Sequence, residues 1–255
     1  MHDSEKIKRA VQQYYSQDAG QFYDKTRFAG LGGQVRHLRE LNTIRQLTGD
    51  VAGQKILEVG CGTGRFSESL LQSKAQVTVL DFSPAMLDYT KRRLSHHPDF
   101  SLLRADAEYL PFKDNQFDGV LSVKLVSHFA NPQKVLNEFQ RVVNPGGWVI
   151  VDANNLFRLD FPLVFLKKYF NFSLHYFAQK NMYSSYLTPW QIEKLYQIHG
   201  LSRQALVGVG LLPKLPALIK RLGVDDFVGL DINLCKNKIL RYVTPMCVML
   251  YKKGE

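Results

Sequence analysis

The stretch Ile-Leu-Glu-Val-Gly-Cys-Gly-Thr-Gly at residues 56–64 decides the fold. An apolar run that predicts a strand leads directly into Gly60, Gly62 and Gly64, and a helical pattern follows. Glycine lets the backbone turn tightly and approach a ligand without interference from a Cβ atom. The spacing G-x-G-x-G differs from the G-x-G-x-x-G of dinucleotide enzymes, which place a pyrophosphate at the helix N-terminus. We therefore expect a nucleoside ligand with a zwitterionic tail and no phosphates.

From residue 55 onward, apolar runs alternate with segments of helical periodicity. The runs that predict the first strands are Lys55–Val59, Gln76–Leu80, Phe100–Arg104, Phe117–Val123 and Gly147–Asp152. Two later strands are predicted at Leu201–Val209 and Met246–Tyr251. Strands that alternate with helices predict an α/β fold, in which helices cover a parallel sheet.

Three predicted helices begin with a side chain that can cap the helix, followed by a proline that needs no donor there. They start at Ser83-Pro84, Asn131-Pro132 and Thr188-Pro189. The third start belongs to a capping box, and Gly200 comes later, so residues 188–199 are predicted as a helix. Before the sheet, residues 4–17 and 34–48 are predicted as amphipathic helices joined by a glycine-containing loop, 30–33.

Two acidic residues stand at the ends of predicted strands. Asp81 lies twenty-one residues after Gly60, at the end of the second strand, where it can accept hydrogen bonds from ribose hydroxyls. Asp106 follows the third strand, where it can accept from an adenine amino group. Ligands of open α/β sheets bind at the carboxyl ends of the strands. The sequence therefore predicts that the glycine turn and both aspartates form one nucleoside site.

Five motifs within residues 55–151 carry a family resemblance. They are EVGCGTG (58–64), LDFSPAML (80–87), DAEYLPF (106–112), FDGVLSV (117–123) and RVVNPGG (141–147). Together they resemble the class I S-adenosylmethionine-dependent methyltransferases, in particular the small-molecule group that includes the ubiquinone and menaquinone biosynthesis methyltransferases. The resemblance implies a Rossmann-like doubly wound seven-stranded sheet with its last strand antiparallel. It also implies S-adenosyl-L-methionine as the cofactor and S-adenosyl-L-homocysteine as the product.

Carried over position by position, the resemblance implies how the glycine turn holds the cofactor. Backbone groups of Gly60, Cys61 and Gly62 would contact the methionine part, and Glu58 would organise the loop nearby. Val123, at the end of the fourth strand, would lie beside the methionine carboxylate. The alternative for Cys61 is a small apolar filler beside the glycines, because buried cysteines behave as small hydrophobic residues.

The resemblance also implies how the nucleoside part is held. Asp81 would accept from both ribose hydroxyls, and Asp106 would accept from the adenine amino group. The Ala107 amide would donate to the adenine ring, while Phe82 and Met86 would lie on its two faces. The alternative for Phe82 and Met86 is that both belong to the core.

His128, just past the fourth predicted strand, is the candidate catalytic residue. An acceptor hydroxyl or acidic carbon must lose a proton before it takes a methyl group, and a nearby base assists this. Histidine titrates near neutrality, which suits that task. The alternative is that His128 only shapes the pocket. Tyr23, in a stretch that resembles the N-terminal lid of the group, is expected to close over the cofactor, against the alternative that it only packs.

The chain is predicted to form a single methyltransferase domain over residues 1–255. Its parts are N-terminal lid helices (1–50), the cofactor-binding core (55–151) and two cap insertions at the ligand-binding edge of the sheet (154–187 and 211–241). The first insertion contains ten aromatic residues, which favours a small, apolar or aromatic hydroxylated acceptor for O- or C-methylation. The basic segment 214–222 of the second is interpreted as an ordinary cap helix, with peripheral contact to an anionic membrane as the alternative.

The lengths of the apolar runs and the spacing of the cysteines indicate where the protein is expected and whether it binds a metal. No apolar run reaches the length of a transmembrane helix, and Cys61, Cys235 and Cys247 show no metal-ligand spacing. We therefore expect a cytoplasmic protein without a metal site. The net charge of +10 indicates either an anionic partner or only good solubility.

Two other functions remain open from the sequence. A nucleic-acid methyltransferase is suggested by the net charge. The Asn/Asp-Pro-Pro-Tyr motif of enzymes that methylate base amino groups is replaced here by Ser-Val-Lys-Leu at residues 122–125, so a nucleic-acid partner is not expected. The other alternative is a non-catalytic protein that binds the cofactor, because a fold does not fix its function. The oligomeric state is not predicted.

Overall fold

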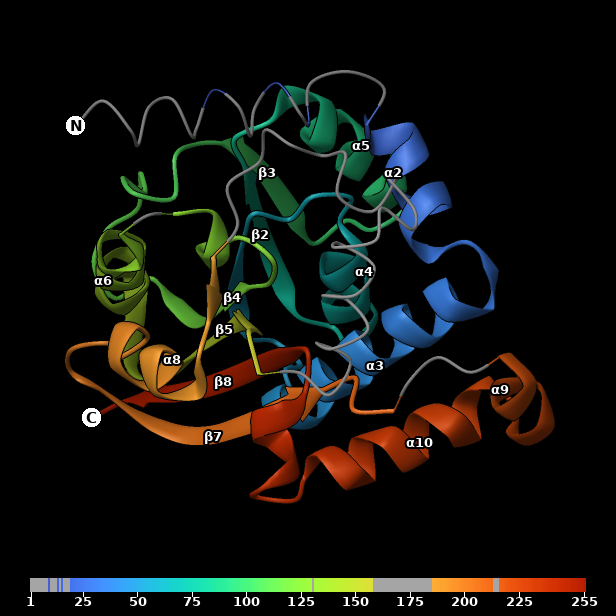
Figure 1. The fold of residues 1–255 in the computed structure, drawn as a ribbon. Coiled ribbons are helices and arrows are strands. Elements are labelled where there is room, and N and C mark those ends of the chain that lie inside the picture. The colour runs from blue at the N-terminus through green and yellow to red at the C-terminus, as the bar shows by residue number, and fades with distance from the viewer. Residues whose placement is uncertain are drawn as a thin grey trace.

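The computed structural model describes residues 9, 13, 15, 19–129, 131–157, 185–212 and 216–255. A mixed sheet crosses its centre (Figure 1), with strands in the order β3-β2-β1-β4-β5-β8-β7. The strands are β1 (Lys55–Val59), β2 (Gln76–Asp81), β3 (Phe100–Arg104), β4 (Phe117–Ser122), β5 (Val143–Asn155), β6 (Tyr186–Leu187), β7 (Leu201–Val209) and β8 (Met246–Lys253). Strands β1 to β5 are parallel, and β8 is antiparallel to both of its neighbours. The predicted Rossmann-like sheet is confirmed, and the short strand β6 beside β5 is an addition to it.

Strand β5 is longer than predicted at both ends. It starts at Val143 rather than Gly147, because Val143 already pairs with Phe117 of β4. At its other end the buried Asn155 side-chain amide donates to the carbonyls of Tyr242 and Thr244, at 2.8 and 2.9 Å. Asn154 also pairs with Tyr186 of β6 and Met246 of β8, so pairing on both sides extends the strand beyond its apolar run.

The helices and short 3₁₀ turns fill the connections. They are α2 (Ala19–Phe28), α3 (Gly30–Thr48), α4 (Arg65–Gln72), α5 (Pro84–Leu94), η1 (Val126–His128), α6 (Pro132–Val142), α8 (Pro189–Leu195), α9 (Pro216–Leu222), α10 (Val224–Cys235) and η2 (Leu240–Val243). The three predicted start signals are confirmed. The Ser83, Asn131 and Thr188 side chains each accept from a backbone amide in the first turn of α5, α6 and α8.

The prediction of a loop at residues 30–33 is wrong, because α3 begins at Gly30 and a separate helix, α2, precedes it. The two helices meet at a sharp corner. A Cβ atom on Gly33 would come within 2.4 Å of the Phe28 carbonyl carbon, so glycine is needed for the close approach. The predicted helix at 4–17 lies outside the described residues, apart from Arg9, Gln13 and Tyr15.

The helix predicted at 188–199 ends early, at Leu195. The Gln133 side chain of α6 donates to the carbonyls of Leu195 and Gln197, at 2.7 and 3.2 Å. These bonds satisfy carbonyl groups that a continuing helix would satisfy itself, so the chain can leave the helical path there.

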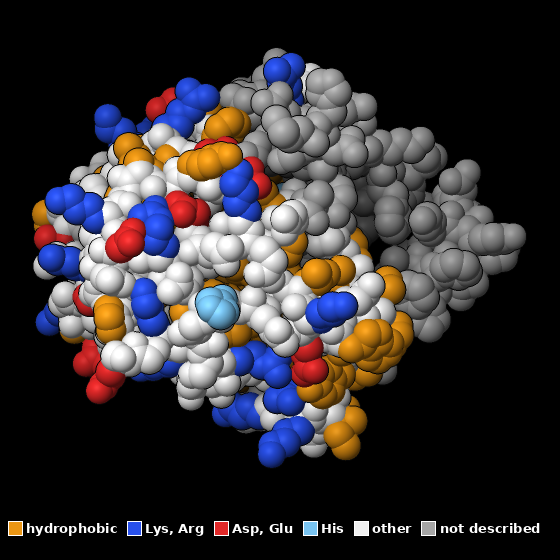
Figure 2. All heavy atoms as spheres, turned by 90° about the vertical axis from the view of Figure 1, so that its left-hand side faces the viewer, with side chains coloured by type: hydrophobic (Ala, Val, Ile, Leu, Met, Phe, Trp, Pro, Cys, Tyr) orange, Lys and Arg blue, Asp and Glu red, His pale blue; other side chains and the backbone are white. Residues whose placement is uncertain are grey.

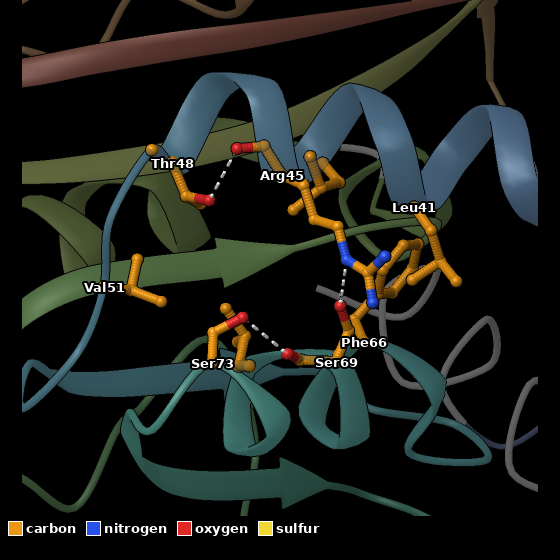
Figure 3. A pocket seen from close by; sticks show the side chains of 10 residues that line it. Leu41, Arg45, Thr48, Val51, Phe66, Ser69 and Ser73 are labelled. Atoms are coloured by element: carbon orange, nitrogen blue, oxygen red, sulfur yellow. Dashed lines mark hydrogen bonds between the residues drawn. The ribbon is translucent and has the colours of Figure 1, made fainter.

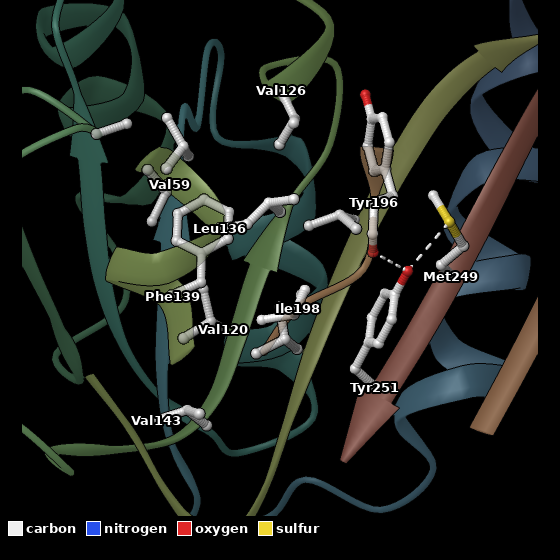
Figure 4. Close-up of a cluster of buried hydrophobic side chains, with 14 of the residues drawn as sticks. Val59, Val120, Val126, Leu136, Phe139, Val143, Tyr196, Ile198, Met249 and Tyr251 are labelled. Atoms are coloured by element: carbon white, nitrogen blue, oxygen red, sulfur yellow. Dashed lines mark hydrogen bonds between the residues drawn. The ribbon is translucent and has the colours of Figure 1, made fainter. Parts of the chain in front are cut away.

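Hydrophobic layers cover both faces of the sheet. On one face α6 and α8 pack against β1, β4, β5 and β8, and Figure 4 shows Phe139 of α6 and Tyr196 among the valines of this cluster. The Tyr251 hydroxyl donates to the Tyr196 carbonyl and so joins β8 to the end of α8. On the other face α3, α4 and α5 supply Leu41, Phe66 and Leu87 to a second cluster. These layers fix the carboxyl ends of the parallel strands, where the site lies.

The second predicted insertion packs along α3 (Figure 1). Ile219 of α9 and Phe227, Val228 and Ile232 of α10 form a small buried cluster with Val35 of α3. A buried ion pair reinforces this contact: Nε of Arg39 on α3 lies 3.0 Å from Oδ2 of Asp231 on α10. Helices α9 and α10 therefore belong to the layer outside α3, and the capping role of 211–241 stays a prediction.

The first predicted insertion is described only at its two ends, since residues 158–184 lie outside the described part of the chain. Among the residues that the structure does describe, no helix is long and apolar enough to cross a membrane.

Candidate functional site

The glycine turn between β1 and α4 approaches the end of β2 closely. The amides of Gly60 and Cys61 both donate to the Leu80 carbonyl, at 2.8 and 3.1 Å. Gly60 and Gly62 have left-handed backbone conformations, with φ of +75° and +54°, which favour glycine. A Cβ atom built on Gly62 would meet no atom within 4 Å. The turn therefore leaves open space directly against its backbone.

Asp81, the last residue of β2, links this turn to the next strand end. Its Oδ2 accepts from the Gly62 amide at 2.9 Å, and its Oδ1 accepts from the Ser83 amide at 2.9 Å. Burial raises the pKa of the Asp81 carboxyl, while the amide donors oppose that rise. Each carboxylate oxygen has a further lone pair. Asp81 can thus hold the turn and still accept from a ligand.

A pocket at the carboxyl ends of β1, β2 and β4 brings most of the predicted site residues together. Those that line it are Tyr23, Gly60, Cys61, Gly62, Asp81, Phe82, Met86, Asp106, Ala107, Val123 and His128. Glu58 is the predicted site residue that does not line it. The structure therefore gathers residues from four of the five motifs, together with Tyr23 and His128, around one cavity.

Glu58 and Cys61 support the turn from within the protein. The Glu58 carboxylate accepts from the Ser67 hydroxyl of α4, and burial raises the pKa of Glu58 to about 7. The buried Cys61 thiol lies 3.8 Å from the Thr90 hydroxyl, and burial raises its pKa well above the usual value. A thiol that stays protonated is a poor nucleophile, which favours the filler interpretation of Cys61.

The side of the pocket near β2 and β3 offers both an aromatic ring and polar groups. The Phe82 side chain is 38% exposed, whereas Met86 is only 1% exposed and is also part of the core. The Asp106 Oδ1 atom accepts from the Glu108 amide at 3.0 Å, which fixes the carboxylate at the end of β3. Phe82 is therefore the more accessible of the two predicted covers for an adenine.

The opposite side of the pocket is the segment from Val123 to Phe129. The 3₁₀ turn η1 is closed by the His128 amide, which donates to the Leu125 carbonyl at 2.9 Å. His128 is mostly buried and lines the pocket together with Leu125 and Phe129. This segment therefore brings the His128 imidazole, apolar side chains and Lys124 to the same side of the pocket.

Residues before α3 complete the pocket. The rings of Tyr15 and Tyr23 lie 6.0 Å apart, and both line the pocket. The Arg27 guanidinium lies over the Tyr23 ring at 4.6 Å. Tyr23 is therefore at the pocket wall, where the lid interpretation places it.

A second tie holds α2 against the glycine turn. The Thr63 hydroxyl donates to Asp24 Oδ1 of α2 at 2.8 Å. Arg93 of α5 pairs with Asp24 Oδ2 at 2.9 Å and donates to the Thr63 carbonyl at 2.9 Å. Side chains of α2 and α5 therefore hold the turn, in addition to the contacts from the end of β2.

The sequence interpretation missed Arg65, the residue directly after Gly64. Its guanidinium lines the pocket, forms a buried ion pair with Glu40 of α3, and lies over the Phe28 and Phe66 rings at 4.5 and 4.1 Å. Burial and the charge of Arg65 lower the pKa of the neighbouring His37. The sequence shows a cation directly after the glycine turn. Its partner Glu40 lies in another helix, so the sequence alone did not indicate the buried ion pair.

Lys124 also lines the pocket and was not predicted as a site residue. In the sequence, Lys124 belongs to the Ser-Val-Lys-Leu stretch at residues 122–125, which stands where nucleic-acid methyltransferases have a different motif. No group of three or more His, Cys, Asp or Glu side chains is placed to hold a metal ion within the described ranges.

A separate pocket lies between the second half of α3 and α4 (Figure 3). Arg45 and Ser69 meet at its edge, where Arg45 Nε donates to the serine hydroxyl at 2.9 Å. Of its lining residues only Phe66 is shared with the main pocket. Because it contains none of the predicted site residues, the main pocket is the candidate site.

Comparison with known proteins agrees with this geometry. A family model described as a methyltransferase domain matches residues 57–151. Residues 57–151 are therefore similar to a methyltransferase domain. The matched region contains the glycine turn, Asp81, Asp106 and His128, and it confirms the resemblance to class I methyltransferases.

Individual relatives and solved structures extend the comparison. A demethylmenaquinone methyltransferase of Renibacterium salmoninarum is 39% identical over 134 residues, which are 52% of this chain and 54% of the relative. A ubiquinone biosynthesis O-methyltransferase of Chromobacterium violaceum is 26% identical over 78% of this chain and 85% of its own. The chain spans about half the length of the first of these relatives.

Among solved structures, magnesium protoporphyrin IX methyltransferase of Synechocystis PCC 6803 with bound S-adenosylhomocysteine has a TM-score of 0.66. It is 13% identical to this chain and covers 97% of it and 100% of its own length. At this identity the likeness shows a shared fold.

Proposed function

We propose that the protein transfers a methyl group from S-adenosyl-L-methionine to a small, apolar or aromatic hydroxylated acceptor, by O- or C-methylation. The observation that carries the proposal is the pocket in which the glycine turn, Asp81 and Asp106 lie opposite His128. The family match to residues 57–151 supports it.

The pocket residues fit this cofactor. The open space against Gly62 suits a ligand that packs closely on the backbone. Asp81 keeps lone pairs for ribose hydroxyls, and Phe82 exposes an aromatic face for an adenine. When bound, the cofactor supplies an electrophilic methyl group on a positively charged sulfonium.

The chain's own residues would then place the acceptor and take its proton. Val123, Leu125 and Phe129 form an apolar wall that keeps water from the acceptor, and His128 stands in that wall as the candidate base. The relatives named for demethylmenaquinone and for ubiquinone biosynthesis support an aromatic or quinone-type acceptor. Figure 2 shows one face of the molecule, on which Asp and Glu side chains lie among the Lys and Arg side chains, so this face does not single out a nucleic acid as the acceptor.

The first test is calorimetric titration of the purified wild-type chain with S-adenosyl-L-methionine and S-adenosyl-L-homocysteine. Binding of both in the micromolar range is expected. Transfer of labelled methyl from the cofactor is then measured with a naphthoquinol, a catechol and, for contrast, an oligonucleotide pool. Binding without transfer to the small acceptors would favour a non-catalytic cofactor-binding protein, and no binding at all would refute the proposal.

A further inference from the structure

Lys124 has an unusual backbone for its residue type. It follows β4 directly with φ of +63°, in the left-handed region that side chains with a Cβ atom rarely adopt. Asp152 of β5 holds it there, because the Lys124 amide donates to Asp152 Oδ1 at 2.6 Å and Asp152 is 1% exposed. Local strain of this kind collects at functional sites, where the surrounding structure can maintain it.

The same carboxylate also directs the lysine side chain. The Lys124 ammonium lies 3.3 Å from Asp152 Oδ2 and contacts Met246 Sδ, and the side chain is one-third exposed at the pocket wall. An ammonium has three N–H donors. Within the described part of the chain these two atoms are its hydrogen-bond or ion-pair partners. A donor therefore remains for a ligand.

The surrounding charges make Lys124 the cation suited to an anion in this pocket. The other cation at the wall, Arg65, is buried and paired with Glu40. Glu40 also feels the charge of Lys124, and both cations lower its pKa against the opposing effect of burial. The groups that face Lys124 are thus Asp152 on β5, Glu40 on α3 and His128 on the same pocket wall.

We propose that Lys124 binds an anionic oxygen of the methyl acceptor, so that the site selects acceptors with an acidic phenol or enol. This inference rests on the proposed function and adds a substrate class to it. On binding, the acceptor O–H bond breaks, its electron pair stays on oxygen, and the proton passes to the imidazole of His128, the base of the proposed function. The ammonium stabilises the resulting phenolate or enolate through a charge-assisted hydrogen bond. Neutral alcohols and amines can accept only a weaker hydrogen bond from the ammonium, so they gain less from this contact.

The test uses 4-nitrophenol as a probe, because it absorbs visible light as the phenolate. The full chain is saturated with S-adenosyl-L-homocysteine, so that no transfer occurs, and the absorbance of bound probe is followed against pH. In wild type the bound probe should ionise about one pH unit below the free probe, which corresponds to about tenfold tighter binding of the phenolate. In Lys124→Met this shift should be lost, whereas Lys124→Arg should retain most of it. Lys113→Met, at an exposed lysine outside the pocket, is the matched control.

A second pair of variants distinguishes loss of the Lys124 charge from loss of folding caused by an unpaired Asp152. Lys124→Met alone leaves the buried Asp152 without its ion pair. In Asp152→Asn the new amide oxygen can still accept from the Lys124 backbone amide, and the ammonium loses its competing carboxylate. Asp152→Asn should therefore bind the phenolate at least as tightly as wild type, and adding Lys124→Met to it should remove the ionisation shift of the bound probe.

Several outcomes would overturn the inference. An unshifted ionisation of the probe in wild type, or the same shift in Lys124→Met, would show that Lys124 does not bind the anion. Weaker binding of S-adenosyl-L-homocysteine to Lys124→Met, with the probe shift intact, would assign the lysine to the cofactor. Tighter binding of benzoate than of the phenolate would replace the phenol or enol class by carboxylates. If S-adenosyl-L-homocysteine fails to bind wild type, the proposed function itself fails, which is a distinct result.

Discussion

Replacing Glu58 by glutamine should make the protein more stable at alkaline pH, although Glu58 is almost fully buried. Burial raises the pKa of Glu58 from 4.5 to about 7, against the opposing hydrogen bond from Ser67. The folded state therefore keeps a proton that the unfolded state has already released. Stability from this group is complete below the unfolded pKa and is lost as the pH rises through the folded value.

The size of the effect follows from the shift. At about 1.4 kcal/mol per pKa unit, a change from 4.5 to about 7 corresponds to about 3 kcal/mol of unfolding free energy. Glutamine carries no charge at any pH, and its amide oxygen can accept from the Ser67 hydroxyl as the carboxylate does. Glu58→Gln should thus match wild type near pH 4, below the unfolded pKa, and exceed it by about 3 kcal/mol near pH 8.

The assay is urea unfolding of both proteins at several pH values between 4 and 8, with the free energy of unfolding extrapolated to water. Ser67→Ala is a useful companion variant. Loss of the Ser67 donor should raise the Glu58 pKa further, so the decline in stability should continue to a higher pH than in wild type. A difference between wild type and Glu58→Gln that stays constant across this range would refute the reasoning. Other buried acids affect both proteins equally and cancel in the comparison.

Three other substitutions test the site directly. Asp81→Asn leaves one acceptor oxygen for two backbone amides and for the ribose, so S-adenosyl-L-homocysteine affinity measured by calorimetry should fall about 10- to 100-fold; unchanged affinity would contradict the assignment. His128→Ala should leave that affinity intact and slow methyl transfer about 10²- to 10⁴-fold, and full turnover would exclude it as the base. Gly64→Ala puts a Cβ 2.8 Å from Thr90 Cγ2 at φ of +74°, so urea unfolding should show a loss of more than about 1 kcal/mol, and wild-type stability would argue against this packing.

The sequence was sufficient for the elements that local patterns determine. Strands β1 and β3 have the predicted bounds, because each is an apolar run closed by residues that end a strand. The glycine turn, Asp81 and Asp106 were also predictable, since their spacing from strand ends places them at one edge of a parallel sheet.

What the sequence could not supply depends on contacts between distant residues. Glycines near Gly30 indicate a loop by propensity, but the absence of a Cβ on Gly33 lets α3 start against Phe28. The early end of α8 depends on Gln133, which lies in another helix. The left-handed backbone of Lys124 depends on Asp152, one strand away. In each case a tertiary contact overrides the local preference.

The tie between Asp24, Thr63 and Arg93 has a consequence for the protein as a whole. It attaches helix α2 to the loop that would hold the methionine part of the cofactor. We therefore expect a coupling free energy between the packing of α2 against this loop and the binding of the cofactor in the pocket. By reciprocity, a change that separates α2 from the loop should lower the affinity for the cofactor, and a bound cofactor should make that separation less favourable. Helix α2 is thus a part of the chain through which a contact made outside the pocket is expected to change the affinity for the proposed cofactor.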